Sequence, residues 1–580
     1  MMMAKANSAL RRGYVVSGGA LVHYREAGNA DAPVVVMLHD SPRSSRLHDE
    51  TMRVLGRRFR VVGLDTPGYG NSDPLALSTP VIEDFGKALA ATLAALGLEG
   101  APLYATHTSA KIALAYVDHA QHSGLTTPCL LVLDGLSMPE TLASADFIAA
   151  YMRPFEIDDA GAYLAREWSR TRDMLRWFPW FTSTPDKRIA MEAPSPEWMA
   201  DYLIDLMSAG PAYSSAYGAA MRYDPAPALG RVTCPTLVAA RADDVLHGFL
   251  PRAQAVGSAQ VQVQSLPANR EAWLTWLEGT LAEAPAFVRA PAAQAEQAAM
   301  AYVDLPHGQM RITRHGDHAH GPAALVIGAP TALHAHAWAQ ALAPHMASIV
   351  PELPGLGESD ALPGATAEAM SDALAAMLRA IGAGPVAVVA IGWAAPIGAL
   401  LAGRHPDLVR ALAVDGAPSL DAASNAAIAT RLCPDFAFDA QGGSHLHRIW
   451  HYLRDGEAQW PWFDLSQAAM RRLPPLFDGA ALHDALTAML KQPAYWGDAA
   501  RAALALADPA AAWAAVRVPT LAFAHADPAF AHAASLAELA SDAHTHPRPD
   551  SMADTARAFA AFCAGTQVSN GSLNNSEASA

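Results

Sequence analysis

Residues 106–110 bring together side chains that could do chemistry, since they read Thr-His-Thr-Ser-Ala. An apolar run ends just before them and a stretch rich in small residues follows, so the pattern predicts a strand, a tight turn and a helix. A threonine hydroxyl on such a turn can attack a carbonyl carbon if a neighbouring base takes its proton. We therefore predict Thr108 as a candidate nucleophile, with a polar contact to a ligand as the alternative.

The chain carries its motifs twice. LDTPGYGNSDP at residues 64–74 corresponds to PELPGLGESDA at residues 351–361, and CPTLVAARADD at 234–244 corresponds to VPTLAFAHADP at 518–528. YLAREWSRTRDMLRWFPWF at residues 163–181 aligns without a gap with HLHRIWHYLRDGEAQWPWF at residues 445–463. Because the period has the size of a domain, we predict a duplication and not a solenoid.

The copies are expected at residues 1–285 and 299–564. The stretch 286–298 is rich in Ala and Pro and is predicted to be a linker, and the small polar stretch 565–580 is predicted to be a disordered tail.

Within each copy, apolar strand-like runs alternate with helical stretches, which predicts a mostly parallel, doubly wound sheet. Each sheet is interrupted by a helical segment rich in tryptophan, at about 137–228 in the first copy and about 418–508 in the second. We expect these two segments to be inserted helical caps.

Composition restricts the partners. The chain has 580 residues, of which 52% are hydrophobic, and its formal net charge is -16. This charge argues against a surface for nucleic acid or for an anionic membrane. No uncharged apolar run approaches the ~20 residues of a membrane span, and the first residues lack the apolar core of a signal peptide. We therefore expect a cytoplasmic protein.

The order and spacing of four motifs carry a family resemblance. They are LHDSP at 38–42, LDTPGYGNSD at 64–73, THTSA at 106–110 and ARADD at 240–244. In this order the chain resembles the α/β-hydrolase superfamily, in the cap-bearing branch that contains epoxide hydrolases, haloalkane dehalogenases and C–C bond hydrolases. The resemblance implies two tandem α/β-hydrolase folds, each a doubly wound, mostly parallel sheet with an inserted helical cap.

The resemblance also assigns positions in the first copy. It places the nucleophile at Thr108, the orienting acid at Asp243, and the loop that binds the oxyanion at His39 and Asp40, with Ser109 offering a backbone N–H and His107 packing behind the turn. The histidine base of the family would follow the last strand, but Asn269 and Arg270 stand there. Without an imidazole a threonine stays protonated. His247 is the candidate substitute.

The equivalent positions in the second copy are poorer still. Ala394 falls at the nucleophile position, with Ala395 as its backbone donor, Asp527 as the acid and Gly328 in the oxyanion loop. Asp550 and Ser551 stand where a histidine is expected. Since the family's serine and histidine are missing from both copies, the resemblance implies degenerate catalytic triads.

Three hypotheses follow. The chain is an enzyme that acts on a small, largely apolar substrate from a non-standard site in the first copy, by hydrolysis of an ester or a C–C bond or by a lyase-type step. Alternatively, it is an inactive duplicated fold that binds a ligand or a partner chain, or the two copies pair and build a composite site. None of these calls for a metal or another cofactor. The partner would be a small molecule, not nucleic acid or a membrane, and an oligomer stays open.

Overall fold

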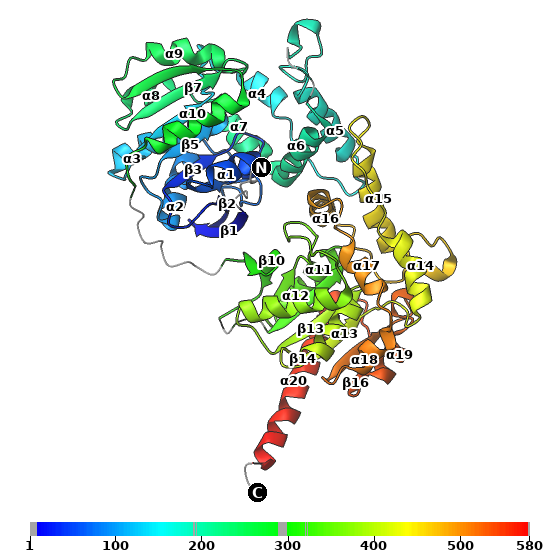
Figure 1. The fold of residues 1–580 in the computed structure, drawn as a ribbon. Coiled ribbons are helices and arrows are strands. Elements are labelled where there is room, and N and C mark those ends of the chain that lie inside the picture. The colour runs from blue at the N-terminus through cyan, green and yellow to red at the C-terminus, as the bar shows by residue number, and fades with distance from the viewer. Residues whose placement is uncertain are drawn as a thin grey trace, which may run out of the picture. The chain divides into compact units, whose positions relative to one another are not determined.

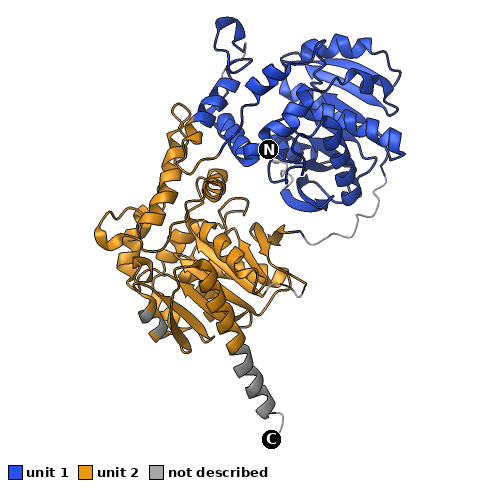
Figure 2. Ribbon diagram, turned by 180° about the vertical axis from the view of Figure 1, so that it is seen from behind, with its two compact units in different colours: residues 1–156, 166–298 blue, residues 157–165, 299–580 orange. Residues whose placement is uncertain are grey.

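The computed structural model describes residues 9–189, 192, 194–287, 298–319, 321 and 323–577. The chain divides into two compact units, drawn in different colours in Figure 2. The first unit comprises Met1–Glu156 and Arg166–Ala298, and the second comprises Ile157–Ala165 and Ala299–Ala580.

The first unit is built on an eight-stranded sheet in the order β1-β2-β4-β3-β5-β6-β7-β8. Its strands are β1 (Leu10–Ser17), β2 (Ala20–Ala27), β3 (Val34–Leu38), β4 (Arg60–Leu64), β5 (Leu103–Thr106), β6 (Leu131–Asp134), β7 (Thr236–Arg241) and β8 (Val261–Leu266). β1 and β2 pair antiparallel, as do β2 and β4, and the other neighbours are parallel.

The second unit repeats this topology, in the order β9-β10-β12-β11-β13-β14-β15-β16 when read from its first strand. Its strands are β9 (Met300–Leu305), β10 (Gly308–His315), β11 (Ala324–Ala329), β12 (Ser348–Pro351), β13 (Val386–Gly392), β14 (Val409–Asp415), β15 (Thr520–Ala524) and β16 (Ala543–Pro547). The predicted pair of tandem, mostly parallel, doubly wound sheets is therefore confirmed (Figure 1).

Helices connect and cover the strands. In the first unit they are α1 (Asp49–Leu55), α2 (Ile82–Leu96), α3 (Thr108–Ser123), α9 (Leu250–Ala255) and α10 (Arg270–Ala282). In the second they are α11 (Leu333–Leu342), α12 (Ala367–Ala380), α13 (Ala395–Arg404), α19 (Ala533–Leu539) and α20 (Met552–Glu577).

Further helices are inserted between the sixth and seventh strand of each sheet. They are α4 (Ala145–Tyr151), α5 (Tyr163–Met174), α6 (Pro196–Ala209), α7 (Ser214–Met221) and α8 (Ala226–Arg231) after β6, and α14 (Ala422–Leu432), α15 (Ser444–Ala458), α16 (Gly479–Lys491), α17 (Asp498–Leu504) and α18 (Pro509–Ala514) after β14.

Successive side chains of a strand pack alternately into the cores on the two faces of the sheet. In β11, Leu325 and Ile327 belong to one buried cluster while Ala324 and Val326 belong to the cluster on the opposite face. Because successive strand side chains point to opposite faces, a continuous apolar run is what a sheet covered on both sides requires. The carboxyl ends of the parallel strands therefore converge at one rigid edge, where side chains can be positioned.

The two predicted irregular stretches have different outcomes. Most of the predicted linker, residues 288–297, lies outside the described residues. Over the predicted tail, α20 extends past residue 565 to Glu577, and the prediction of disorder stays a prediction.

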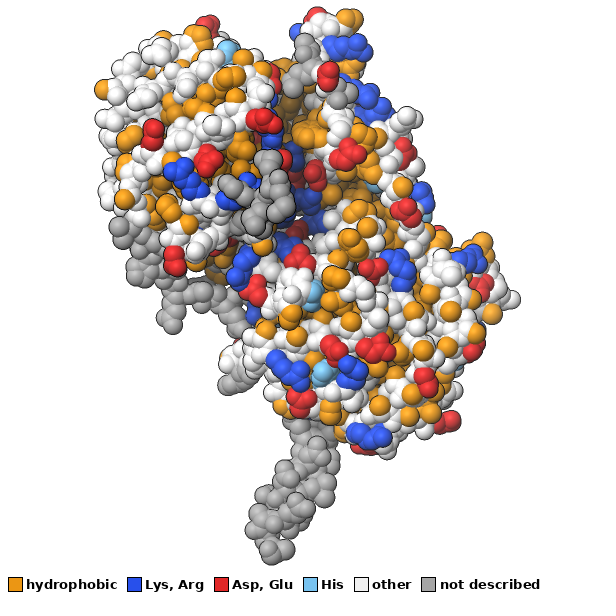
Figure 3. Space-filling model, viewed as in Figure 1, with side chains coloured by type: hydrophobic (Ala, Val, Ile, Leu, Met, Phe, Trp, Pro, Cys, Tyr) orange, Lys and Arg blue, Asp and Glu red, His pale blue; other side chains and the backbone are white. Residues whose placement is uncertain are grey.

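On the face drawn in Figure 3, basic and acidic side chains are interspersed over the surface. Within the described part of the chain, none of the helices combines the length and the apolar character needed to cross a bilayer.

Candidate functional site

The turn between β5 and α3 has an unusual backbone. His107 has φ 51° and ψ −114°, and it is the one residue other than glycine with a positive φ among the described residues. Such a conformation costs of order 1–3 kcal/mol and is kept where surrounding structure enforces it, often at functional sites. In a strand-turn-helix site this strained position is that of the nucleophile.

The prediction of Thr108 as the nucleophile is therefore wrong in its position. Thr108 is the first residue of α3 and is 9% exposed. A β-branched residue resists a positive φ, which explains why the turn is made by the residue before it.

Ser109 holds this turn together from inside. Its hydroxyl donates to the carbonyl oxygen of Thr106 at 2.9 Å and accepts the backbone N–H of the same residue at 3.0 Å. Because the side chain is fully buried and both contacts close the turn, its role is structural. The backbone donor next to the strained position belongs to Thr108, in the first turn of a helix, where amides lack intrahelical partners.

The imidazole of His107 reaches across the end of β6 to a carboxylate in the loop after β7. Its Nε2 lies 2.8 Å from Oδ2 of Asp244, in the loop that follows β7. The ring leans over the end of β6, since a Cβ added to Gly135 would lie 2.8 Å from Nε2. The strained residue is thus a histidine with a carboxylate partner.

The acid of this pair is Asp244 and not the predicted Asp243. Asp243 is exposed and is bound by the guanidinium of Arg241, whose Nε lies 2.9 Å from Oδ1. Asp244 also accepts the backbone N–H of Leu246 at 2.7 Å, which fixes its orientation.

Electrostatics favour the charged form of both partners. Burial disfavours the imidazolium, but the hydrogen bond and the negative charge of Asp244 outweigh it and raise the pKa of His107 to about 9. Burial likewise disfavours the carboxylate of Asp244, yet the contact with His107 lowers its pKa. At neutral pH the pair is therefore an imidazolium and a carboxylate.

A second acid, Asp134, ends β6 beside the pair. Its Oδ2 accepts hydrogen bonds from the hydroxyl of Tyr104 and from Nε1 of Trp273, both at 2.8 Å. Burial is the largest influence and raises the pKa of Asp134 despite these donors. Asp134 adds negative potential behind His107 and is one of the charges that favour its imidazolium.

Three other predicted residues have separate places. His39 is buried, its Nε2 accepts the backbone N–H of Thr66 at 2.9 Å, and its Nδ1 lies 2.7 Å from the carbonyl oxygen of Asp40, so it braces the loop. The Oδ1 atom of Asp40 is buried without a hydrogen-bond partner among the described residues. The predicted substitute base, His247, bonds through Nε2 to Oγ of Ser265 at 2.8 Å and not to Asp244.

A pocket of about 350 Å³ opens on the pair. His107, Asp134 and Asp244 line it, together with Arg241, Arg270 and Trp273. A small molecule in this pocket could exchange a proton with the imidazole of His107.

Replacing Asp244 with asparagine should lower the pKa of His107 from about 9 towards its ordinary value of about 6.5, because the largest influences that oppose burial are the hydrogen bond and the charge of Asp244, with smaller ones from Asp40 and Asp134. NMR titration of the imidazole Cε1–Hε1 signal, assigned by its loss in His107→Gln, measures this. The matched control is Asp243→Asn, which should leave the pKa near that of the wild type. An unchanged titration in Asp244→Asn would show that the ion pair does not control the imidazole.

The second unit has a glycine at the position that corresponds to His107. Gly392, the last residue of β13, has φ +54° and occupies the strained position, ahead of the predicted Ala394 and Ala395. Both alanines are fully buried at the start of α13, so their assignment to the nucleophile and oxyanion positions is wrong by two residues. Trp460 covers the glycine, and its ring stacks on Trp393 with centroids 3.7 Å apart.

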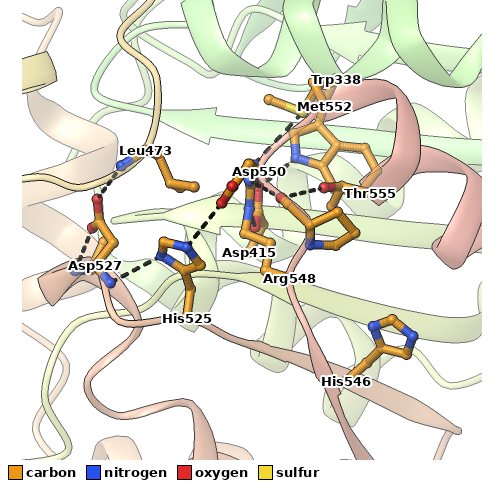
Figure 4. A network of polar contacts seen from close by, with 12 residues as sticks. Trp338, Asp415, Leu473, His525, Asp527, His546, Arg548, Asp550, Met552 and Thr555 are labelled. Atoms are coloured by element: carbon orange, nitrogen blue, oxygen red, sulfur yellow. Dashed lines mark hydrogen bonds and ion pairs between the residues drawn. The ribbon is translucent and has the colours of Figure 1, made fainter.

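An ion pair in the second unit joins the end of β14 to the residue that follows β16. Arg548, directly after β16, donates from Nε to Oδ1 of Asp415 at 2.6 Å, and Nε1 of Trp338 donates to Oδ2 at 2.6 Å. Figure 4 shows this network, with His546 lying apart from it.

Asp527 does not orient a histidine base in this arrangement. It is buried, forms an ion pair with Arg471 at 2.9 Å and caps the short helix that follows by accepting the N–H of Ala529 at 3.0 Å. His525 lies between Asp527 and Asp550 in Figure 4: its Nδ1 accepts the backbone N–H of Asp527 at 3.0 Å, and its Nε2 lies 3.3 Å from Oδ1 of Asp550. Gly328, in β11, lines a pocket of about 320 Å³ on this side of the sheet.

Substitution of Gly392 by alanine should destabilise the second unit by about 1–3 kcal/mol. The alanine would have to keep the backbone φ of +54°, and its Cβ would lie 2.9 Å from Cη2 of Trp460. Gly364→Ala is the matched control, because Gly364 has φ +65° but no atom within 4 Å of the added Cβ. Urea unfolding followed by tryptophan fluorescence measures both, and equal losses would show that Trp460 does not confine the turn.

Parts of the chain are similar to known families and proteins. A family model described as the alpha/beta hydrolase fold matches residues 325–550. An uncharacterized hydrolase of Saccharomyces cerevisiae is 38% identical over 55 residues, which are 10% of this chain and 19% of the yeast protein. The match thus spans about a fifth of that curated relative.

Solved structures are similar over about half of the chain. Epoxide hydrolase A from Mycobacterium thermoresistibile is 19% identical, with 48% of this chain and 100% of that chain covered and a TM-score of 0.37. The enol-lactonase from Burkholderia xenovorans LB400 is 19% identical, with 47% and 100% covered and a TM-score of 0.36. Haloalkane dehalogenase DbeA from Bradyrhizobium elkani USDA94 is 18% identical, with 47% and 95% covered and a TM-score of 0.35.

Proposed function

Because this chain belongs to the α/β-hydrolase superfamily, we propose that its first unit is an enzyme that uses His107 and Asp244 in place of the usual triad. The substrate is a small, largely apolar carbonyl compound, and the reaction is hydrolysis of an ester or a C–C bond or a lyase-type step. The observation that carries this proposal is the strained His107 at the strand-helix turn, 2.8 Å from Asp244.

The neutral imidazole acts as a general base in this proposal. The contact with Asp244 uses Nε2, so Nδ1 takes a proton from water, and the resulting hydroxide attacks the carbonyl carbon of an ester. The N–H of Thr108 stabilises the oxyanion, and the proton on His107 passes to the alcohol as the C–O bond breaks. No covalent intermediate forms on the enzyme.

The raised pKa sets the pH at which this base works. With a pKa of about 9, only about 1% of His107 is neutral at pH 7, and the neutral fraction rises about tenfold per pH unit until the pKa is reached. The carboxylate of Asp244 at the same time makes the neutral imidazole a stronger base.

A substrate panel with the purified full chain tests the proposal. The panel contains 4-nitrophenyl esters, vinylogous diketones, epoxides and haloalkanes, and a fluorophosphonate probe is applied in parallel. We expect turnover of at least one carbonyl substrate without labelling by the probe, because no serine stands at the strained position. Labelling of a serine, or inactivity towards every carbonyl compound, would contradict the proposal.

The second candidate function, a non-catalytic ligand-binding fold, is favoured by Gly392 for the second unit alone. A glycine supplies neither a nucleophile nor a base.

A further inference from the structure

We propose that the pocket of the second unit is a binding site for a small, uncharged aromatic molecule that carries a hydroxyl group. This inference goes beyond the catalytic role proposed for the first unit and does not depend on it. It is drawn from the shape, the aromatic lining and the charge pairing of one cavity.

The cavity lies where a substrate pocket would lie in a catalytic unit, but a glycine and a tryptophan form its floor. It measures about 320 Å³, within the range of small-molecule sites, and Gly392 and Trp393 line it. The rings of Trp393 and Trp460 are nearly parallel, with an interplanar angle of 5°. A flat indole surface therefore stands where a reacting side chain would be.

Aromatic and aliphatic side chains make up most of the wall. The apolar residues that bear on the argument are Tyr452, Trp460, Trp462, Leu473, Leu476 and Phe530. Tyr452 and Trp462 meet edge to face with centroids 5.5 Å apart, which fixes their planes. Flat, rigid apolar walls favour a planar aromatic molecule through stacking and burial of apolar area.

The buried charged groups of the wall already have ionisable partners within hydrogen-bond distance. Arg548 is bound to Asp415 at 2.6 Å and Arg471 is bound to Asp527 at 2.9 Å. Glu457 is bound to His334 at 2.6 Å.

A charged ligand would have to break one of these pairs or bury a charge without a counter-ion, and both cost free energy. An uncharged ligand avoids this cost.

One polar group of the wall, the imidazole of His334, can form a hydrogen bond with a hydroxyl group of a ligand. Nε2 of His334 contacts Oε1 of Glu457, whose other oxygen accepts the N–H of Leu476 at 3.0 Å. Burial works against the carboxylate, but the contact with His334 lowers the pKa of Glu457, so the glutamate accepts and Nε2 donates. Nδ1 of His334 is then left to form a hydrogen bond with a ligand hydroxyl, which can donate or accept.

Calorimetric titration of the full chain with 1-naphthol tests the inference. We expect saturable binding of 1-naphthol, and at least tenfold weaker binding of naphthalene-1-sulfonate, which has the same rings and a negative charge. Trp460→Ala should raise the Kd for 1-naphthol about tenfold by removing the stacking surface. Leu473→Trp, which fills the cavity and keeps the stack, should also weaken binding.

Phe178→Ala is the matched control. Phe178 aligns with Trp460 in the first copy and is 57% exposed, so its loss should leave the Kd unchanged. Circular dichroism of each variant reports on folding. Absence of 1-naphthol binding, equal binding of the sulfonate, or a Kd that neither pocket variant changes would overturn the inference.

Discussion

Replacing His107 with alanine should lower kcat/KM for the carbonyl substrates by about 10²–10⁴-fold, the usual contribution of a general base. The same loss is expected for His107→Gln, which keeps the approximate size of the side chain but cannot take the proton. Initial rates over a range of substrate concentrations measure the effect. Because the change removes proton transfer in the transition state, kcat should fall with kcat/KM.

Thr108→Ala is the control for this prediction. The backbone N–H at residue 108 survives the substitution, so kcat/KM should stay close to the wild-type value. A large loss in Thr108→Ala, with little loss in His107→Gln, would return the nucleophile to the threonine and refute the proposed role of His107.

Replacing Arg548 with methionine should destabilise the second unit by about 3–5 kcal/mol. The substitution leaves Asp415 buried without its counter-ion, and both side chains of the pair are only 4% exposed. The donor Nε1 of Trp338 remains but supplies no charge. The free energy of unfolding, obtained from urea titration, measures the loss.

The matched control replaces an arginine of an exposed pair. Arg379 lies 3.1 Å from Asp407, and their side chains are 50% and 63% exposed. Because water screens such a pair, Arg379→Met should cost at most about 1 kcal/mol. Equal losses in the two variants would show that Asp415 does not need its partner.

The architecture could be predicted from the sequence because it depends on patterns that repeat along the chain. Apolar runs such as residues 324–327 require two covered faces, and the duplicated motifs give the same order of elements twice. The candidate site depends on single backbone angles, which such patterns do not fix.

His107 shows this limit most clearly. The motif THTSA marks the turn, and the hydrogen bonds of Ser109 close it, but the sequence pattern does not say which residue takes the positive φ. The one available signal was the β-branched threonine, which fits that conformation poorly.

The carboxylate partner of His107 was harder to predict, because two carboxylates adjacent in the sequence differ only in the direction in which their side chains point. Asp243 and Asp244 are adjacent, and the loop after β7 turns one to Arg241 and the other to His107. From the sequence, Asp134 could be predicted only to lie at the end of a strand. Its partners Tyr104 and Trp273 are 30 and 139 residues away in sequence and are brought to it by the fold.

The two units differ at the strained turn and in the ion pairs near the strand ends. In the first, a histidine stands at the strained turn and keeps a carboxylate partner. In the second, a glycine stands there and an arginine neutralises the carboxylate at the end of β14. We infer that catalysis and ligand binding are divided between the copies.

The pH dependence of kcat/KM for a hydrolysed 4-nitrophenyl ester tests the role of His107 most directly. After subtraction of the rate with His107→Gln, log(kcat/KM) should rise with a slope of one and level off near pH 9, where the imidazole becomes neutral. A profile that levels off near pH 6.5, or that does not depend on pH below 9, would contradict a base held by Asp244.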